Sequence, residues 1–174
     1  DAGFSVKLGV DFDDAALKTF EANHEGATAL KLDLFNLDNV NVIQDFFDKN
    51  NYKLDVLVGG PPCQGFSLAG PRQIDDSRNK LYQAMVMTAR ILRPRVVVLE
   101  NVPGMIQLHG GLVKDKIISD FTALGYKMGE PKILYAPDYG VPQIRKRVVF
   151  VGLLGAIEEF SYPIPILKPE EYVT

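Results

Sequence analysis

The sequence predicts an α/β fold, a mostly parallel sheet with helices on both of its faces. Short apolar segments alternate along the chain with helical stripes, and several of these segments end on an acidic residue or on glycine. Fully apolar strands that alternate with helices are typical of parallel sheets covered on both sides. With 174 residues, of which 47% are hydrophobic, the chain is long enough to form one globular domain with a core of its own.

The N-terminal third contains three apolar segments, at residues 6–10, 27–32 and 54–58. Asp13 and Asp14 offer an N-cap to the first helix. The helical stripes that follow the first two segments consist of Ala15, Leu17 and Phe20, and of Val42, Ile43, Phe46 and Phe47. We therefore expect two strand–helix units, followed by a third strand that runs into Gly59.

The pattern continues after a loop at residues 59–77 that is rich in Gly, Pro and Ser. A helix that ends before Pro94 precedes an apolar strand at residues 96–99, and a second helix ends near Gly125. The apolar faces of these helices consist of Leu81, Met85, Thr88 and Leu92, and of Val113, Ile117, Phe121 and Leu124. Two further strands are expected at about residues 127–135 and 147–153.

The composition excludes several classes of protein. Cys63 is the single cysteine, so neither an internal disulfide nor a cysteine-rich zinc site is expected. No run approaches about 18 consecutive apolar residues, and the first residues do not resemble a signal peptide. We therefore expect neither a membrane span nor secretion. The net charge of −3 argues against a uniformly basic surface for nucleic acid but allows a local basic patch.

Ligands of such sheets bind beyond the carboxyl ends of the strands. Asp11 and Asp33 follow the first two expected strands, where carboxylates can accept hydrogen bonds from a ribose, and Phe12 could stack on a base. Taken singly, Asp11 as an N-cap and Phe12 as a core residue are the more ordinary interpretations, and only the joint placement of these residues favours a ligand. Glu100 and Asn101 follow the fourth strand.

Cys63 lies in the string GGPPCQGFS at residues 59–67. A lone cysteine is usually a small buried side chain, but a Gly- and Pro-shaped loop after a strand presents it to a cleft, as a nucleophile would be. The two histidines, His24 and His109, do not lie at strand ends, so protease-like acyl transfer is disfavoured.

Three strings together resemble the AdoMet-dependent cytosine-5 DNA methyltransferases. They are GGPPCQGFS at 59–67, LENVPG at 99–104 and YGVPQIRKRVVFVG at 139–152. The resemblance covers nearly all of residues 1–155 and implies a Rossmann-like methyltransferase fold. It also implies S-adenosylmethionine (AdoMet) as cofactor and double-stranded DNA with an extruded cytosine as substrate.

The resemblance implies a role for each residue of a candidate site. Cys63 is the nucleophile that adds to C6 of cytosine, Glu100 is the acid at N3, and Arg145 and Arg147 are the motif's two arginines, of which Arg145 lies at O2. Asn101 orients the loop. The expected cofactor contacts are Asp11, Phe12, Asp33, Pro61 and Leu81, and the expected contacts to DNA are Pro62, Gln64, Ser67 and Gln143. No metal is implied.

Some family elements have no counterpart in the sequence. The chain opens at what resembles the helix after the family's first strand and Gly-rich turn, and residues 156–174 resemble a connector to a target-recognition domain. We therefore expect residues 1–155 to be a catalytic core that lacks its first strand and is inactive alone. For a prokaryotic source, the resemblance implies a cytoplasmic, nucleoid-associated enzyme of a restriction–modification system.

Two alternatives stay open. A tRNA cytosine-5 methyltransferase would use the same chemistry, but Gly65 after the Pro-Cys-Gln motif and the lack of a Cys-Phe-Thr string favour DNA. A non-catalytic regulatory module of the same fold is disfavoured because Cys63, Glu100 and Arg145 are all present.

Overall fold

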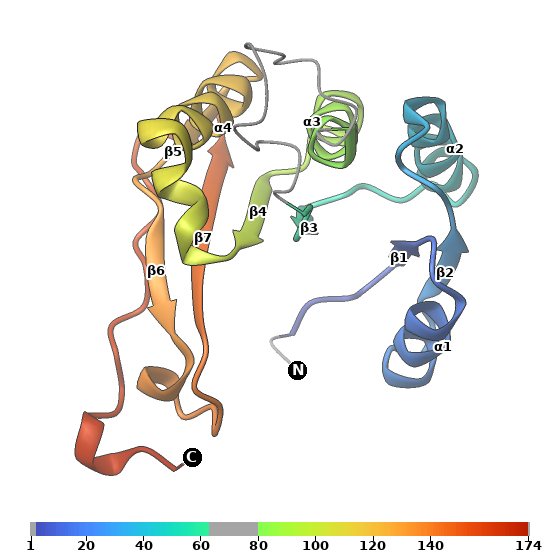
Figure 1. Cartoon of the computed structure of the whole chain (residues 1–174). Helices are drawn as coiled ribbons and strands as arrows, with labels where there is room; N and C mark the ends of the chain where they lie inside the picture. Colours follow the sequence, from blue (N-terminus) through green and yellow to red (C-terminus); the bar gives the residue numbers. More distant parts are fainter. Residues whose placement is uncertain (1–2, 63–79, 174) are drawn as a thin grey trace.

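The structure of the chain is a computed structural model that describes residues 3–62 and 80–173 (Figure 1). It confirms the α/β class, with strands and helices alternating along the chain. The described strands form two sheets, one of two strands and one of five.

The smaller sheet pairs β1 (Leu8–Asp11) in parallel with β2 (Thr28–Lys31). They are connected by α1 (Asp14–Asn23), whose first turn is capped by Asp13: its carboxylate accepts a hydrogen bond from the Ala16 amide at 2.8 Å. Helix α1 lies directly on β1, since a Cβ at Gly9 would come within 2.6 Å of the Phe20 ring.

The larger sheet has the order β3–β4–β7–β5, with β6 also paired to β7. Its strands are β3 (Val56–Gly59), β4 (Val96–Asn101), β5 (Tyr126–Met128), β6 (Lys132–Tyr135) and β7 (Lys146–Leu154). Strands β3 and β4 are parallel, whereas β7 is antiparallel to β4, β5 and β6. The antiparallel part was not foreseen. It follows from the short connection between β6 and β7, which has no room for a crossover helix.

One expected strand, at residues 127–135, is divided into β5 and β6. The break falls at Gly129, Glu130 and Pro131, because proline lacks the amide that a continuous strand would need. Both pieces remain paired to β7.

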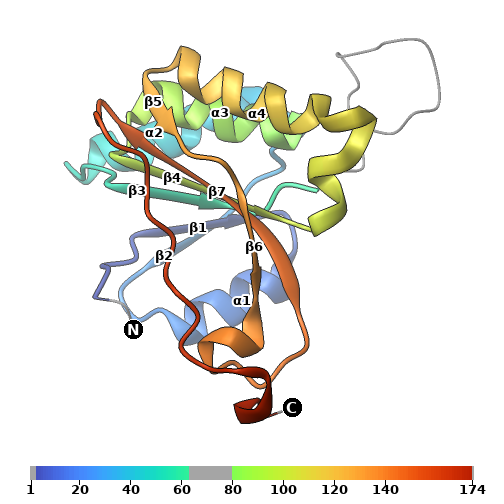
Figure 2. The same cartoon turned by 90° about the vertical axis from the view of Figure 1, so that its left-hand side faces the viewer.

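Helices cover both faces of the strands (Figure 2). On one side lie α2 (Val40–Lys49), α3 (Lys80–Leu92) and α4 (Leu112–Ala123), and α1 lies on the other. The main core lies between α3, α4 and the larger sheet. Its most deeply buried side chains include Leu99, Ile117, Phe121, Val148 and Phe150.

The two sheets are not joined by strand pairing. Within the described residues, β1 pairs with β2 alone and β3 pairs with β4 alone, so each leaves one edge open toward the other sheet (Figure 1). Contacts between α2 and α3 connect the two halves instead.

Candidate active site

The candidate site lies where β3 and β4 end side by side. Gly59, the last residue of β3, is in register with Leu99, so residues 60–62 leave the sheet beside Glu100 and Asn101. Successive side chains of a strand point to opposite faces. Along β4, Val97, Leu99 and Asn101 are buried, whereas Glu100 is only half-buried on the other face.

Glu100 forms an ion pair with Arg147 of β7. The distance from Arg147 Nε to Glu100 Oε1 is 2.7 Å, and the two side chains are 27% and 41% exposed. The register explains the contact: Glu100 lies opposite Val149, so Arg147, two residues earlier on β7, is its diagonal neighbour on the same face. Antiparallel pairing thus brings together two residues that are far apart in the sequence.

The second oxygen of Glu100 lies near the Gly60 backbone. A Cβ built at Gly60 would be 3.3 Å from Glu100 Oε2, so a side chain there would crowd the carboxylate. Within the described residues, Oε2 accepts no hydrogen bond. Glu100 therefore has one oxygen fixed by an arginine and one oxygen free beside the segment that leads to Cys63.

Asn101 ties the ends of the two strands together. Its Nδ2 donates to the Pro61 carbonyl at 2.7 Å, and its Oδ1 accepts from the Val102 amide at 2.9 Å. Asn101 is 8% exposed, so both of its polar ends are satisfied in a nearly buried position. Pro61 is half-buried and Pro62 is exposed beside it.

Two further predicted site residues, Arg145 and Gln143, lie at the surface. Arg145 and Gln143 are exposed in the loop before β7, and the Arg145 guanidinium makes no hydrogen bond or ion pair within the described part of the chain. The structure therefore brings Arg147, not Arg145, to Glu100. Cys63, Gln64 and Ser67 lie outside the described residues.

The expected cofactor residues gather at the smaller sheet. Asp11 ends β1, and Asp33 lies two residues beyond β2, on the same edge of the sheet because the strands are parallel. One carboxylate oxygen of each accepts a local amide hydrogen bond: Asp11 Oδ1 from Asp13 at 3.0 Å, and Asp33 Oδ1 from Phe35 at 2.9 Å. The second oxygen of each carboxylate is free within the described residues.

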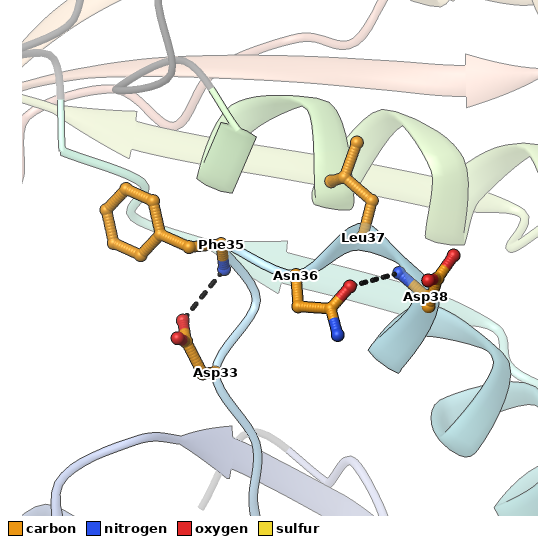
Figure 3. A pocket seen from close by; sticks show the side chains of 5 residues that line it. All are labelled: Asp33, Phe35, Asn36, Leu37 and Asp38. Atoms are coloured by element: carbon orange, nitrogen blue, oxygen red, sulfur yellow. Dashed lines mark hydrogen bonds between the residues drawn. The ribbon is translucent and has the colours of Figure 1, made fainter.

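Asp33 also lines an open pocket of about 510 Å³ (Figure 3). Its other lining residues are Phe35, Asn36, Leu37 and Asp38. Phe12, at the end of β1, is 64% exposed, so it is not the core residue that the ordinary interpretation would make it. Leu81 is half-buried in the first turn of α3 and does not line this pocket.

A family model described as C-5 cytosine-specific DNA methylase matches residues 1–171. The chain belongs to this family.

Two curated relatives are bacterial Type II methyltransferases. The chain is 37% identical over 167 residues to M1.HphI of Haemophilus parahaemolyticus, and 40% identical over 155 residues to M.BspRI of Lysinibacillus sphaericus. These matches cover 94% and 89% of this chain but only 44% and 34% of the relatives. The chain therefore spans less than half the length of these two relatives.

Solved structures share the fold. A prophage-encoded protein of E. coli, described as a DNA modification methyltransferase, matches with a TM-score of 0.73 and 37% identity over 88% of this chain and 41% of its own. The S. pombe Dnmt2 methyltransferase matches with a TM-score of 0.64 and 21% identity, over 89% of this chain and 45% of its own. The second likeness bears on the fold alone. These neighbours confirm the Rossmann-like methyltransferase architecture.

Sequence reasoning missed a polar cluster behind the site of this methylase chain. The Tyr82 hydroxyl of α3 donates to Asp120 of α4 at 3.1 Å, and Lys116 holds both oxygens of that carboxylate, at 3.0 and 3.1 Å. Burial, reinforced by the Asp120 carboxylate, raises the pKa of Tyr82 well above its usual range. Tyr82 also lies against Pro61 and Pro62 around a void of about 10 Å³, so the cluster supports the segment that leads to Cys63. The sequence contains a signal for this cluster: Tyr82 lies three residues before Met85, and Asp120 lies three residues after Ile117. Residues three apart are neighbours on a helix surface, so both polar side chains could be placed beside the apolar helix faces.

The described residues offer neither a membrane-spanning helix nor a metal cluster. None of their helices is long and apolar enough to cross a membrane. None of their His, Cys, Asp and Glu side chains form a group of three or more that could hold a metal ion.

Proposed function

We propose that the protein containing this chain transfers a methyl group from AdoMet to C5 of a cytosine extruded from double-stranded DNA. The observation that carries the proposal is the Glu100–Arg147 pair beside residues 60–62, in a chain of the C-5 cytosine methylase family. The Type II relatives support a restriction–modification role in a bacterial cytoplasm, on nucleoid DNA.

The proposed mechanism begins with Cys63, because C5 of cytosine is a weak nucleophile. The Cys63 thiolate forms a bond to C6, and the C5–C6 electron pair becomes available at C5 as N3 gains a proton. When bound, AdoMet would supply an electrophilic methyl group to C5, with its S–CH3 bond broken and S-adenosylhomocysteine as the leaving thioether. Loss of the C5 proton to a base, with departure of the Cys63 thiolate from C6, then restores the C5–C6 double bond, and N3 returns its proton to the acid that supplied it.

Glu100 is proposed to donate the proton at N3. Its Oε1 is held by Arg147, so Oε2 is the oxygen that can face the base. Positioned acids of this kind contribute typically 10²–10⁴-fold in rate. Arg145, exposed and without a partner in the described part of the chain, is proposed to approach the cytosine O2 and stabilise the negative charge that develops on the ring.

The remaining site residues are proposed to position the reactants. Asn101 would hold residues 61–62 and so orient the loop that carries Cys63. Pro62, Gln64, Ser67 and Gln143 are proposed to contact the DNA.

Asp11, Phe12 and Asp33 are proposed to bind the adenosine half of AdoMet, with Pro61 and Leu81 completing the site. Each of the two carboxylates keeps one oxygen free, which suits ribose hydroxyls and the adenine amino group. The exposed ring of Phe12 offers a face for stacking. The pocket at Asp33 lies at the same sheet edge.

The full protein is proposed to add two elements to residues 1–155: a strand between β1 and β3, and a target-recognition domain reached through residues 156–174. The open edges of β1 and β3 support the first element, and the greater length of the relatives supports both. Residues 1–174 alone should therefore bind AdoMet far more weakly than the full protein and should not methylate DNA. Calorimetry on both proteins tests this expectation, and equal AdoMet affinities would overturn it.

A 5-fluorocytosine duplex tests the function, because fluorine blocks the loss of the C5 proton that releases the enzyme. The full-length protein with AdoMet should form a covalent adduct with the duplex, and Cys63→Ser should not. An adduct with a fluorinated tRNA but not with DNA would favour the tRNA alternative. No adduct with either nucleic acid would favour a non-catalytic module.

A further inference from the structure

The segment after β7 turns back along β6 and ends beside η5 (Ala136–Tyr139), as both views show (Figures 1 and 2). It is fastened along its length. The Tyr162 hydroxyl donates to the Val149 carbonyl of β7 at 2.8 Å, and the Tyr139 hydroxyl donates to the Pro163 carbonyl at 3.2 Å.

Asp138 of η5 holds the end of this segment through three acceptor bonds. Its carbonyl oxygen accepts the amides of Ile166, at 2.8 Å, and Leu167, at 3.1 Å. Its carboxylate accepts a hydrogen bond from the Tyr172 hydroxyl. This hydrogen bond, together with desolvation, raises the pKa of Tyr172 to about 12. Both side chains are half-buried.

The ring of Tyr172 makes a second contact with the same region. It packs edge-on against Tyr135, the last residue of β6, with ring centroids 5.8 Å apart and planes at 72°. The Lys146 ammonium lies over the Tyr135 ring at 5.3 Å. Tyr172 thus contacts η5 at Asp138 and the end of β6 at Tyr135. Tyr135 in turn contacts Lys146, the first residue of β7.

The same short helix, η5, shapes the loop at residues 140–145. The Ala136 amide donates to the Arg145 carbonyl at 2.9 Å, and the Val141 amide donates to the Ala136 carbonyl at 3.3 Å. Gly140 makes the turn with φ +78°. The side chains of this loop bury little surface, Ile144 being 74% exposed, so hydrogen bonds rather than packing fix its shape.

We infer that Asp138 and Tyr172 are positioning residues, which hold η5 so that the loop at residues 140–145 presents Gln143 and Arg145 to the nucleic acid. The inference uses the proposed function for the identity of the substrate. We call the contacts of Asp138 with Tyr172, Ile166 and Leu167 the clamp, and these contacts do not depend on the proposed function. The clamp connects the segment after β7 to the loop at residues 140–145.

Hydrogen exchange of the full-length protein tests the clamp without any catalytic readout. Tyr172→Phe removes the hydroxyl and Asp138→Ala removes its acceptor, so each should speed exchange of the hydrogen-bonded Val141 and Gln143 amides by about 3- to 10-fold. Tyr162→Phe is the matched control, because it removes a hydroxyl of the same segment that bonds to β7, and it should leave these amides unchanged. Wild-type exchange in both clamp variants would overturn the inference.

Kinetics on duplex DNA then separate positioning from stability. Both clamp variants should raise KM for DNA or lower kcat by about 3- to 10-fold, with unchanged affinity for AdoMet. The double variant should be no worse than either single one, and Asp138→Asn, which keeps an acceptor oxygen, should recover most of the loss. An equal loss of activity on DNA in Tyr162→Phe, or additive losses in the double variant, would mean that the variants act by lowering the stability of the protein. Either result would overturn the positioning role. If no protein variant, wild type included, methylates DNA, the exchange result still decides the clamp and the failure falls on the proposed function alone.

Discussion

At the end of β4, Glu100 and Asn101 lie between β3 and β7, whereas Asp11 and Asp33 lie on a sheet of only two described strands. The first region is fixed by strand pairing on both sides and by a nearly buried amide. Within the described residues, the second has unpaired edges on both sides, and contacts between α2 and α3 join it to the rest. Two-stranded sheets are marginal unless other elements support them. This difference teaches that paired strands on both sides hold Glu100 and Asn101 in place, whereas Asp11 and Asp33 depend on a small sheet with little support from the other described strands.

The largest effect is expected at Glu100. In the full-length protein, Glu100→Gln keeps the shape of the side chain but removes the acid, so kcat should fall by about 10²–10⁴-fold while AdoMet affinity stays unchanged. Glu130→Gln, at a surface ion pair with Lys114, is the matched control and should be neutral. If Glu100→Gln kept the wild-type kcat but bound AdoMet more weakly, Glu100 would be a cofactor ligand, and the two regions would not differ in function.

Asp33 tests the other region. Asp33→Asn should weaken AdoMet binding by about 10-fold, since a hydrogen bond to a charged group is worth about 1.5–3 kcal/mol, and it should leave kcat near wild type at saturating AdoMet. Calorimetry and steady-state kinetics measure the two quantities. Asp45→Asn, at an exposed position of α2, serves as control. A loss confined to kcat would place Asp33 in the chemistry instead.

Asn101 tests whether the first region is rigid. Asn101→Ala would leave the Pro61 carbonyl without its donor and the Val102 amide without its acceptor, and should lower the free energy of unfolding by about 1–3 kcal/mol. Urea denaturation measures it. Asn23→Ala, which removes only an exposed bond to the Thr19 carbonyl, should cost less than about 0.5 kcal/mol. Equal losses would mean that the β4 end is no better fixed than the surface.

The smallest effect concerns alkaline pH. Burial raises the pKa of Tyr126 to about 12, and its hydroxyl donates to the Pro94 carbonyl. Above pH 10 the unfolded chain releases this proton first, so stability falls as pH rises from about 10 toward 12. Tyr126→Phe should flatten this part of the profile of Tm against pH, while Tyr52→Phe, at an exposed tyrosine, should not. An unchanged slope in Tyr126→Phe would show that this tyrosine does not set the alkaline limit of the larger sheet.

The sequence predicted most of the fold because its signals are local. Asp13 as an N-cap and the apolar run at residues 96–99 each act within a few residues, and the structure has the elements that they predict. The register between β4 and β7 could not be predicted, because it depends on the pairing of residues about fifty positions apart. The Glu100–Arg147 contact was missed for that reason, and the bond between Asn101 and Pro61 was missed because it depends on how the ends of β3 and β4 lie side by side. The roles of Cys63, Gln64 and Ser67 stay predictions.

Strand β7 has a consequence for how the protein is made. Strands β4, β5 and β6 all pair with it, yet it comes after all of them in the chain. Synthesis proceeds from the N-terminus at about 5–20 residues per second. Strands β3 and β4 can pair with each other early, but the pairing of β4, β5 and β6 with β7 is possible only after residues 146–154 have been synthesised. Contacts of such long sequence separation also form slowly. The Glu100–Arg147 pair can therefore exist only once this late strand has been added, so the growing chain does not assemble this part of the proposed site before its sheet closes.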